Sequence, residues 1–430
     1  MASALPATNP SEATGLQWLY VDFNSYFASV EQQLQPELRG KPIIVVPVAS
    51  DTTSAIAASY EAKAFGIRTG TNVREAKIKC PGLICVPARH EVYVDFHHKI
   101  LEEIDRHIPV TAVCSIDEVA CRLMRNETSL AAVARIAASI KRGLAENVGE
   151  HVRCSIGVAP NRYLAKVATD LKKPDGFTVI HPHDLPHRLF ALDLRDLPGV
   201  GPNMERRLTA AGIADLPALW ALGAERMRHI WGSIWGERMW HLLRGADLPE
   251  METQRSSLNH SQVLAPDLRV PIKARHVARR LLLKAASRLR RMDYYASALS
   301  FSARLENGGR IEESARFWRA QDSMTFLHKL DELWTRALPQ AAGTRFKMVV
   351  VTVHRLSAAS ELAADLFDTP SGADSEQRAK AERMSRALDK LNHRFGRDTV
   401  QLGALPADCR DHSGAKIAFT RIPDRAEFLE

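Results

Sequence analysis

The chain has 430 residues, a net charge of +8 and an isoelectric point of about 9.2, so it is too long for one hydrophobic core and suits a polyanionic partner. Hydrophobic residues make up 45% and charged residues 25%, which excludes a disordered chain. There is no run of ~18 apolar residues that could span a membrane, and residues 1–16 lack a secretion-signal pattern, so we expect a cytoplasmic protein.

The first 180 residues alternate between strand and helix patterns. After a flexible tail at 1–17, the apolar run at 18–21 predicts a buried strand that ends at Asp22. A second strand, at 110–116, is predicted to lead into Asp117 and Glu118. This alternation predicts a sheet covered by helices. Further strands are predicted at 42–48 and 152–158, and helices at 25–34, 60–65, 72–79, 92–107, 130–147 and 161–171.

Beyond residue 182 the pattern changes. Residues 187–245 predict helices, interrupted by glycine-containing turns, and 246–256 predict a linker. Residues 257–357 predict a smaller α+β unit, and the polar composition of 358–430 predicts a tail without regular structure. In the α+β unit, strands are predicted at 258–264 and 346–353, a hairpin around 307–309, and helices at 268–292 and 323–337.

The predicted helix at 268–292 contains nine Lys or Arg and no acid. Five of these cations recur at helical spacing and predict a basic side, whereas Val and Leu residues predict an apolar side. An ordinary solvated helix gives the same pattern, but phosphate contact is favoured by the other segments described below. The five cations are Lys273, Arg280, Lys284, Arg288 and Arg291.

Asp22, Asp117 and Glu118 are the residues best placed for chemistry. Metal-dependent phosphoryl transfer needs carboxylates that converge on two Mg²⁺ ions about 3.5–4 Å apart. Mg²⁺ prefers hard oxygen ligands, and two neighbouring strands that end in acids can supply them. Acids are also common in turns at strand ends, so turn formation alone is an alternative for these residues. The six cysteines form no CxxC pair, which predicts reduced thiols and no zinc site.

Four segments in order resemble one known family. The runs VDFNSYFASVE at 21–31, ASYEAKAFGI at 58–67, SIDE at 115–118, and SIGVAPN to KPDG at 155–176 are similar to motifs of Y-family translesion DNA polymerases, in the UmuC superfamily. The last is more similar to the DinB, or DNA polymerase IV, branch. The resemblance implies an α+β right-hand fold: a palm sheet at 18–182 with small fingers inserted at about 28–90, a helical helix-hairpin-helix thumb at 183–245, and an α+β little finger at 257–357.

The resemblance also implies roles for the acids. Asp22, Asp117 and Glu118 would be the catalytic residues and would hold two Mg²⁺ ions together with the backbone carbonyl of Phe23. Phe27 would be the steric gate, whose ring excludes a ribose 2′-hydroxyl. The family usually has Arg at the position of Lys63, and Lys loses the bidentate fork of Arg. The residues expected to bind the dNTP are Tyr26, Phe27, Tyr60, Lys63 and Lys173.

Two other segments imply binding partners. Gly199 and Gly201, in a PGVG turn before a helix, resemble a helix-hairpin-helix whose amides meet DNA phosphates. Primer-template DNA would also be bound by Lys273, Arg280 and Lys284. Leu366 and Phe367 resemble the peptide that binds the bacterial sliding clamp, although the usual leading Gln is missing.

The function implied is error-prone translesion synthesis: template-directed transfer of nucleotides from dNTPs to a primer 3′-hydroxyl, in DNA repair and damage tolerance. One alternative is a catalytically weak Y-family-like accessory subunit that binds DNA, but such a protein tends to lose the metal-binding acids. Another is a plain helix-hairpin-helix DNA-binding module, which leaves the first 180 residues unexplained.

Overall fold

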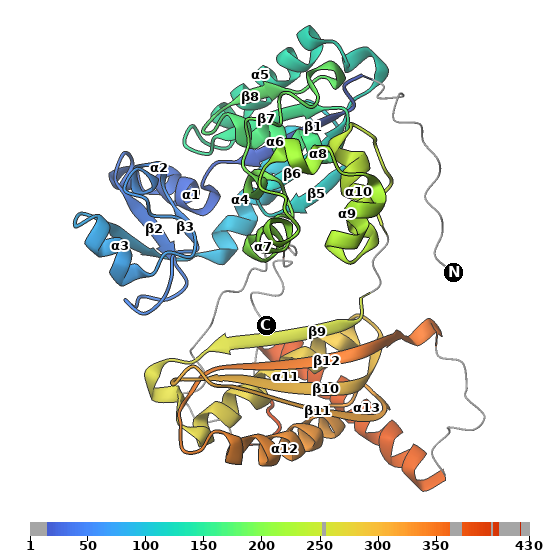
Figure 1. Cartoon of the computed structure of the whole chain (residues 1–430). Coiled ribbons are helices and arrows are strands. Elements are labelled where there is room, and N and C mark those ends of the chain that lie inside the picture. The colour runs from blue at the N-terminus through green and yellow to red at the C-terminus, as the bar shows by residue number, and fades with distance from the viewer. Residues whose placement is uncertain (1–14, 252–254, 362–371, 397–398, 404–421, 423–430) are drawn as a thin grey trace. The chain divides into compact units, whose positions relative to one another are not determined.

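The computed structural model describes most of the chain as two compact units (Figure 1). The first contains the elements up to Glu250, and the second begins at Met251. The described residues are 15–251, 255–361, 372–396, 399–403 and 422. Among these residues, no helix is long and apolar enough to cross a membrane.

The packed chain begins slightly earlier than predicted. Of the expected tail at 1–17, residues 1–14 lie outside the described residues. Leu16 is buried, and the amide of Gln17 donates a hydrogen bond to the carbonyl of Ala159 at 3.1 Å. The ordered fold therefore includes these two residues before the first strand.

A five-stranded sheet forms the centre of the first unit, in the order β5-β6-β1-β7-β8. Strand β1 is buried along its whole length because it pairs antiparallel with β6 on one side and β7 on the other. Helix α6 packs on β1 and β7 (Figure 1). Helix α4 packs against α5. The bounds are β1 Trp18–Phe23, β5 Ala112–Ser115, β6 Glu118–Arg122, β7 Cys154–Ala159, β8 Phe177–Val179, α4 His90–Asp105, α5 Leu130–Asn147 and α6 Arg162–Leu171.

One strand prediction in this sheet needs correction. Strand β5 ends at Ser115, and Asp117 and Glu118 do not end it: Asp117 lies in a tight turn and Glu118 begins β6. It is β6, not β5, that pairs with β1. The hairpin was missed because its turn contains neither Gly nor Pro, the residues that normally mark a chain reversal.

A smaller three-stranded sheet, in the order β3-β2-β4, lies between α1 and α4 in sequence. Its own apolar core includes Ile44, Val46, Ala62, Ile67 and Val73. Three predicted helices and the strand β2 are confirmed, whereas β4 and the two-residue strand β3 were missed. The bounds are α1 Tyr26–Leu34, β2 Ile43–Val46, β3 Ala57–Ala58, α2 Tyr60–Lys63, α3 Val73–Lys79 and β4 Ile84–Pro87.

The predicted helical region at 187–245 is confirmed. Its apolar residues share one core with the central sheet, from Trp18 and Tyr20 of β1 to Met239 of α10. The side-chain amide of Asn161 donates to the carbonyls of Leu242 and Ala246 at 2.8 and 2.9 Å, which holds the end of α10 beside the start of α6. The bounds are α7 Pro202–Ala210, α8 Leu216–Trp220, α9 Ala224–Trp231 and α10 Ile234–Leu243.

The second unit is a four-stranded antiparallel sheet in the order β11-β10-β12-β9, with helices α11 and α12 packed on it. Its core includes Phe301, Phe326, Trp334 and Phe346. The predicted hairpin, strands and helices are confirmed. The bounds are β9 Ser257–Val263, α11 Pro271–Arg291, β10 Tyr294–Leu305, β11 Arg310–Ala320, α12 Ser323–Gln340 and β12 Phe346–Ala358.

The prediction of a structureless tail from residue 358 is wrong in one part. Helix α13, Gly372–Phe395, packs against α11 and α12. Asp389 accepts hydrogen bonds from Arg290, and the Ser385 hydroxyl accepts one from the Ser323 amide at 3.0 Å. A helix held by polar contacts lacks the apolar stripe from which helices are predicted, which explains why it was missed.

Candidate catalytic carboxylate site

The fold brings the three predicted acids together. Asp22 and Glu118 are directly opposed on the paired strands β1 and β6. Asp117 lies in the turn before β6, and its carbonyl accepts a hydrogen bond from the Phe23 amide at 2.9 Å, which ties this turn to β1. On the other side, His97 Nδ1 lies 2.8 Å from the carbonyl oxygen of Ile116 and fixes the same turn.

Two lysines that follow in the chain form ion pairs with acids of this cluster. Lys166, on α6, forms ion pairs with Asp22 and with Glu118, the latter at 2.9 Å. Lys173 lies 2.7 Å from the other oxygen of Asp22. A fourth carboxylate, Asp170, pairs with both lysines, at 3.5 Å from Lys166 and 2.7 Å from Lys173.

No role was predicted for Lys166 or Asp170, although a signal existed. Both lie within the helix predicted at 161–171, and their spacing of four residues puts them on one face. That helix follows a strand of the central sheet, so a charged face directed at the acids could have been inferred. Their part in the site is a finding of the structure.

Hydrogen bonds orient the remaining oxygen atoms. The Tyr20 hydroxyl donates to Glu118 Oε2 at 2.8 Å, and the Ser115 hydroxyl donates to Asp117 Oδ1 at 2.6 Å. Burial raises the pKa of Asp117 to about 6; the Ser115 hydrogen bond opposes this, and the neighbouring charges of Asp22 and Glu118 add to it. The electrostatic coupling means that the three carboxylates lie close enough to repel one another.

The donor set fits a hard divalent cation. Among the residues that the structure describes, no three acidic, His or Cys side chains yet converge tightly enough to enclose an ion. Lys166 and Lys173 contact the two oxygens of Asp22, and Lys166 also contacts Glu118 Oε1. The three carboxylates lie on adjacent backbone segments and repel one another unless positive charge lies between them. Carboxylate oxygens are also the ligands that Mg²⁺ prefers.

The predicted nucleotide-binding cations lie near the acids. On the short helix α2, Lys63 Nζ lies 4.3 Å from the centroid of the Tyr60 ring. Burial raises the pKa of Tyr60 to about 12, with smaller contributions from Asp22 and Asp170, and burial followed by the charge of Lys173 lowers the pKa of Lys63. Two segments distant in sequence, α2 and the loop after α6, therefore direct positive charge toward one place.

Phe27 is a packed residue at the start of α1. Its ring stacks on Tyr93 with centroids 4.4 Å apart and an interplanar angle of 16°. The Tyr93 hydroxyl donates to Glu31 at 2.7 Å, so the ring that supports Phe27 is itself fixed. Tyr26 is 3% exposed and its hydroxyl donates to the Tyr93 carbonyl, which leaves its backbone amide as the group that can meet a ligand.

The two predicted DNA-binding glycines differ in what the fold requires of them. Gly199 has φ +89°, a conformation that favours glycine, and it lies near Trp235. Gly201, at the start of α7, has φ −87°, and a Cβ there would meet nothing within 4 Å. The fold therefore does not explain the glycine at 201, whereas close approach of another molecule to this helix N-terminus would.

The predicted basic side of α11 is only partly correct. Lys284 and Arg291 are exposed, and Lys273 and Arg288 are half-buried. Arg280 is 9% exposed and donates to Gln262 Oε1 at 2.6 Å, so the prediction that it lies on the exposed basic side is wrong. Other cations of this segment also have carboxylate partners: Arg275 and Arg279 with Asp331, Arg290 with Asp389, and Arg269 with Glu306.

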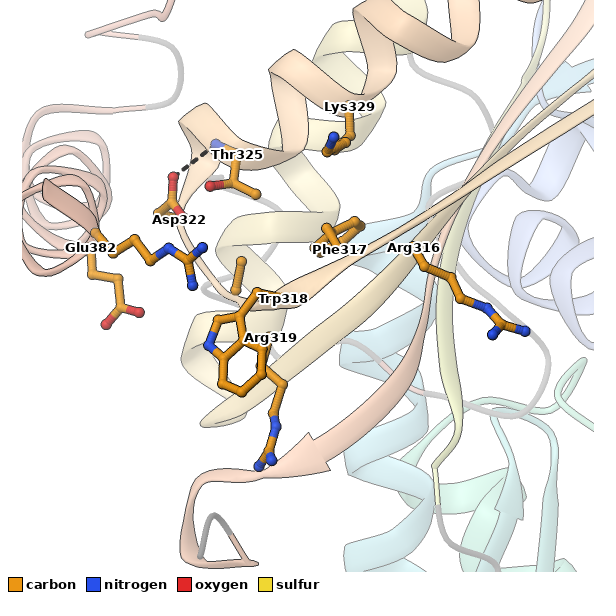
Figure 2. A pocket seen from close by; sticks show the side chains of 10 residues that line it. Arg316, Phe317, Trp318, Arg319, Asp322, Thr325, Lys329 and Glu382 are labelled. Carbon is orange, nitrogen blue, oxygen red and sulfur yellow. Dashed lines mark hydrogen bonds between the residues drawn. The ribbon is translucent and has the colours of Figure 1, made fainter. Parts of the chain in front are cut away.

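A pocket of about 280 Å³ lies in the second unit, at the end of β11 (Figure 2). Trp318 and Arg319 of β11, Lys329 of α12 and Glu382 of α13 line it, and Asp322 accepts a hydrogen bond from the Thr325 amide at its edge. It contains none of the predicted site residues, so it is not the predicted catalytic site.

The cysteines and the predicted clamp-binding pair lie only partly within the described residues. Five cysteines are free thiols, as predicted, and Cys409 lies outside the described residues. Leu366 and Phe367, the predicted clamp-binding pair, also lie outside them.

Comparison with known proteins agrees with the resemblance. Residues 21–170 match the impB/mucB/samB family, and residues 195–247 match the thumb domain of DNA polymerase iota. The protein named DNA polymerase IV of Moorella thermoacetica is 31% identical over 398 residues, which cover 89% of this chain and 94% of that protein. The protein of the same name of Xanthomonas axonopodis pv. citri is 30% identical, over 77% of this chain and 92% of that protein.

Solved structures share the fold. A Y-family DNA polymerase chimera of Dbh and Dpo4 superposes with a TM-score of 0.67 at 23% identity, over 80% of this chain and 99% of that chain. An insertion ternary complex of Dbh DNA polymerase gives a TM-score of 0.51 at 24% identity, over 80% and 99%.

Proposed function

The chain belongs to the Y-family DNA polymerases, in the group that includes DNA polymerase IV, and on this basis we propose that it copies damaged templates by two-metal nucleotidyl transfer. It has the right-hand fold of these DNA-directed polymerases. The observation that carries the proposal is the opposition of Asp22 and Glu118 across paired strands, with Asp117 in the adjoining turn.

In this proposal, Asp22, Asp117 and Glu118 hold two Mg²⁺ ions, together with the backbone carbonyl of Phe23. When bound there, such ions would supply positive charge that lowers the pKa of the primer 3′-hydroxyl and offsets the charge of the leaving pyrophosphate. The protein itself contributes placement. The antiparallel register sets Asp22 against Glu118, and hydrogen bonds from Tyr20 and Ser115 orient the carboxylates before a substrate binds.

The incoming dNTP would lie between α1 and α2. Tyr60, Lys63 and Lys173 would bind its triphosphate, because fixed positive charge stabilises the charge that develops on the phosphates. Phe27 would lie under the sugar, and its stacking on Tyr93 keeps the ring from yielding to a 2′-hydroxyl. Lys63 offers charge but not a bidentate fork, so we expect it to fix the orientation of the phosphate less firmly than an Arg would.

We propose these parts of the hand: a palm at 18–182 with fingers at about 28–90, a thumb at 183–245, a linker at 246–256, and a little finger at 257–357. The amides at Gly201 would receive a backbone phosphate of primer-template DNA, which is supported by the open space at this glycine. In the little finger, Lys273 and Lys284 remain candidates for phosphate contact, and Arg280 does not.

Several finer statements also belong to the proposal. We propose low fidelity, a place in damage tolerance and the SOS response, and action in the bacterial cytoplasm by analogy with the family, and no part of the site geometry carries them. Binding of a sliding clamp through Leu366 and Phe367 is a prediction that deletion of 362–371 can test in a clamp pull-down.

The test is primer extension with Mg²⁺ across a defined lesion, comparing the wild type with Asp117→Asn. We expect the substitution to reduce nucleotide addition on the order of 1,000-fold, because it removes a metal ligand and a charge. Binding of primer-template DNA should persist, which controls for misfolding. If the wild type binds DNA but adds no nucleotide with Mg²⁺ or Mn²⁺, an accessory DNA-binding role is favoured instead.

A further inference from the structure

Lys166 lies where a metal ion is expected. Its ammonium group is ion-paired with Asp22 and lies 2.9 Å from Glu118 Oε1, so it bridges carboxylates from two neighbouring strands. The lysine side chain is 19% exposed. It also lies 5.8 Å from the centroid of the Tyr20 ring, and the Tyr20 hydroxyl holds the other oxygen of Glu118. The protein thus supplies one cation of its own between two of the proposed metal ligands.

Asp170 gives this lysine a second partner. It lies one turn later on α6, and its Oδ2 is 3.5 Å from Lys166 Nζ. The Asp170 side chain is 36% exposed, whereas that of Asp22 is 7% exposed, so the alternative partner lies toward solvent. A lysine has a flexible four-carbon stem, so its charge can be transferred between the two partners by a change of rotamer.

We propose that Lys166 is an internal counter-cation, which holds Asp22 and Glu118 together in the metal-free protein and pairs with Asp170 once a divalent cation binds between them. This inference rests on the proposed function, because it takes the three acids as the metal ligands. Carboxylates packed against each other repel unless positive charge separates them. The ion and the ammonium group need the same oxygen atoms, so they exclude each other.

The arrangement has a consequence for metal affinity. A divalent ion must displace Lys166, so the competing ammonium group lowers the affinity of the substrate-free protein for Mg²⁺. A nucleotide that brings its own phosphate oxygens adds ligands for the ion and helps to overcome this competition. Metal binding is thereby linked to substrate binding through one side chain.

The test measures metal binding without DNA or nucleotide. Lys166→Met removes the competing charge and keeps the side-chain length. The control variant, Lys172→Met, removes one charge from an exposed lysine at the end of the same helix. We expect Mn²⁺, followed by the loss of its free electron paramagnetic resonance signal, to bind Lys166→Met about tenfold more tightly than the wild type. The Lys172→Met control should change affinity less than twofold, and Mg²⁺ should displace the bound Mn²⁺.

Thermal unfolding gives a second measurement on the same proteins. Metal-free Lys166→Met should melt below the wild type, because its acids have lost their counter-cation, and Mg²⁺ should raise its melting temperature by more than that of the wild type. Asp170→Asn should weaken Mn²⁺ binding several-fold in the wild-type background and less in the Lys166→Met background. An equal effect in both backgrounds would show that Asp170 does not serve as the alternative partner of Lys166.

The proposal is overturned if Lys166→Met binds Mn²⁺ no more tightly than the wild type. Should that variant not fold, Lys166→Gln takes its place with the same expected gain. Primer extension by the wild type is measured separately. A wild type that extends primers, with no affinity gain in the variant, refutes the counter-cation alone. A wild type that extends none refutes the proposed polymerase, and metal affinity still decides the role of Lys166.

Discussion

The carboxylate site and the basic helix α11 are both clusters of like charge, but the protein uses them in different ways. At the site, burial and then the neighbouring charges of Asp22 and Glu118 raise the pKa of Asp117, and among the described residues Lys166 and Lys173 supply the ion pairs to Asp22. Along α11, by contrast, Arg275, Arg279 and Arg290 each have an acidic partner within the second unit.

The difference teaches how to interpret charge in a sequence. Acids that the backbone register brings together, at a cost in electrostatic repulsion, indicate a ligand that relieves this repulsion. Cations along a helix indicate a ligand only after their internal partners are subtracted. In α11 much of the charge stabilises the unit itself, so the count of nine cations overstated the surface that DNA could use.

The largest effect expected from this comparison tests whether the carboxylate site faces a nucleotide. Phe27→Ala should reduce discrimination between deoxyribo- and ribonucleotides on the order of 100-fold, because the ring no longer blocks the 2′-hydroxyl. Steady-state kinetics with dCTP and CTP opposite template dG would measure this ratio. Phe301→Leu, in the core of the second unit, is the matched control and should not change it. Unaltered discrimination in Phe27→Ala would remove Phe27 from the site.

The second prediction separates structural from exposed cations on α11. Arg280→Met should lower the free energy of unfolding by about 2 kcal/mol, because Gln262 loses its buried partner. Lys284→Met should leave stability unchanged and reduce the log–log salt slope of duplex DNA binding by about 0.9. Urea unfolding and DNA titrations at several salt concentrations measure both. The comparison fails if Arg280→Met instead weakens DNA binding while stability is retained.

The third prediction concerns the repulsion at the acids. Folding raises the pKa of Asp117 from 3.8 to about 6, so ionisation of Asp117 destabilises the folded state. The protein has its full stability below pH 3.8 and loses part of it as the pH rises through 6. Metal-free Asp117→Asn should therefore exceed the wild type in stability at pH 7 by up to about 3 kcal/mol, with the gap closing at pH 4. Chemical unfolding across this range, with chelator present, is the measurement. A pH-independent gap would contradict the electrostatic explanation.

The smallest effects come from the two glycines. Gly199→Ala should destabilise the protein by about 1 kcal/mol, because alanine is strained at positive φ. Gly201→Ala should change stability by less than about 0.5 kcal/mol, since a Cβ there meets open space, but weaken DNA binding several-fold if a phosphate approaches. Melting curves and DNA titrations of the pair separate the two roles. Full DNA affinity in Gly201→Ala would exclude this glycine from the interface.

Much of the fold was predictable because its elements have strong periodicity. Helix α5 spans the predicted residues 130–147, and strand β1 and the hairpin of β10 and β11 occur where the apolar pattern and Asn307 predict them. Strand β6 was missed because a turn without Gly or Pro gives no sequence signal. Helix α13 was missed because polar contacts, such as that of Asp389 with Arg290, leave no apolar stripe.

The acids of the site could be singled out from the sequence more readily than its cations. Asp22, Asp117 and Glu118 stand in motifs that resemble those of a known family, and the structure brings them together, whereas their role as metal ligands stays a prediction. The position of Lys166 between two of them depends on how α6 packs on β1, a tertiary contact that no local pattern specifies. Burial of Arg280 depends in the same way on Gln262 of a distant strand.

The shared core of the central sheet and the helices α7–α10 has a consequence for how the protein can be divided. Because Tyr20 of β1 packs in the same apolar cluster as Met239 of α10, a fragment that stops near residue 182 would expose the inner surface of the central sheet to water. Such a fragment should aggregate or unfold, whereas one that extends through Glu250 retains the cluster. The smallest piece able to keep Tyr20, and through it Glu118, in place therefore includes the helices that follow the sheet.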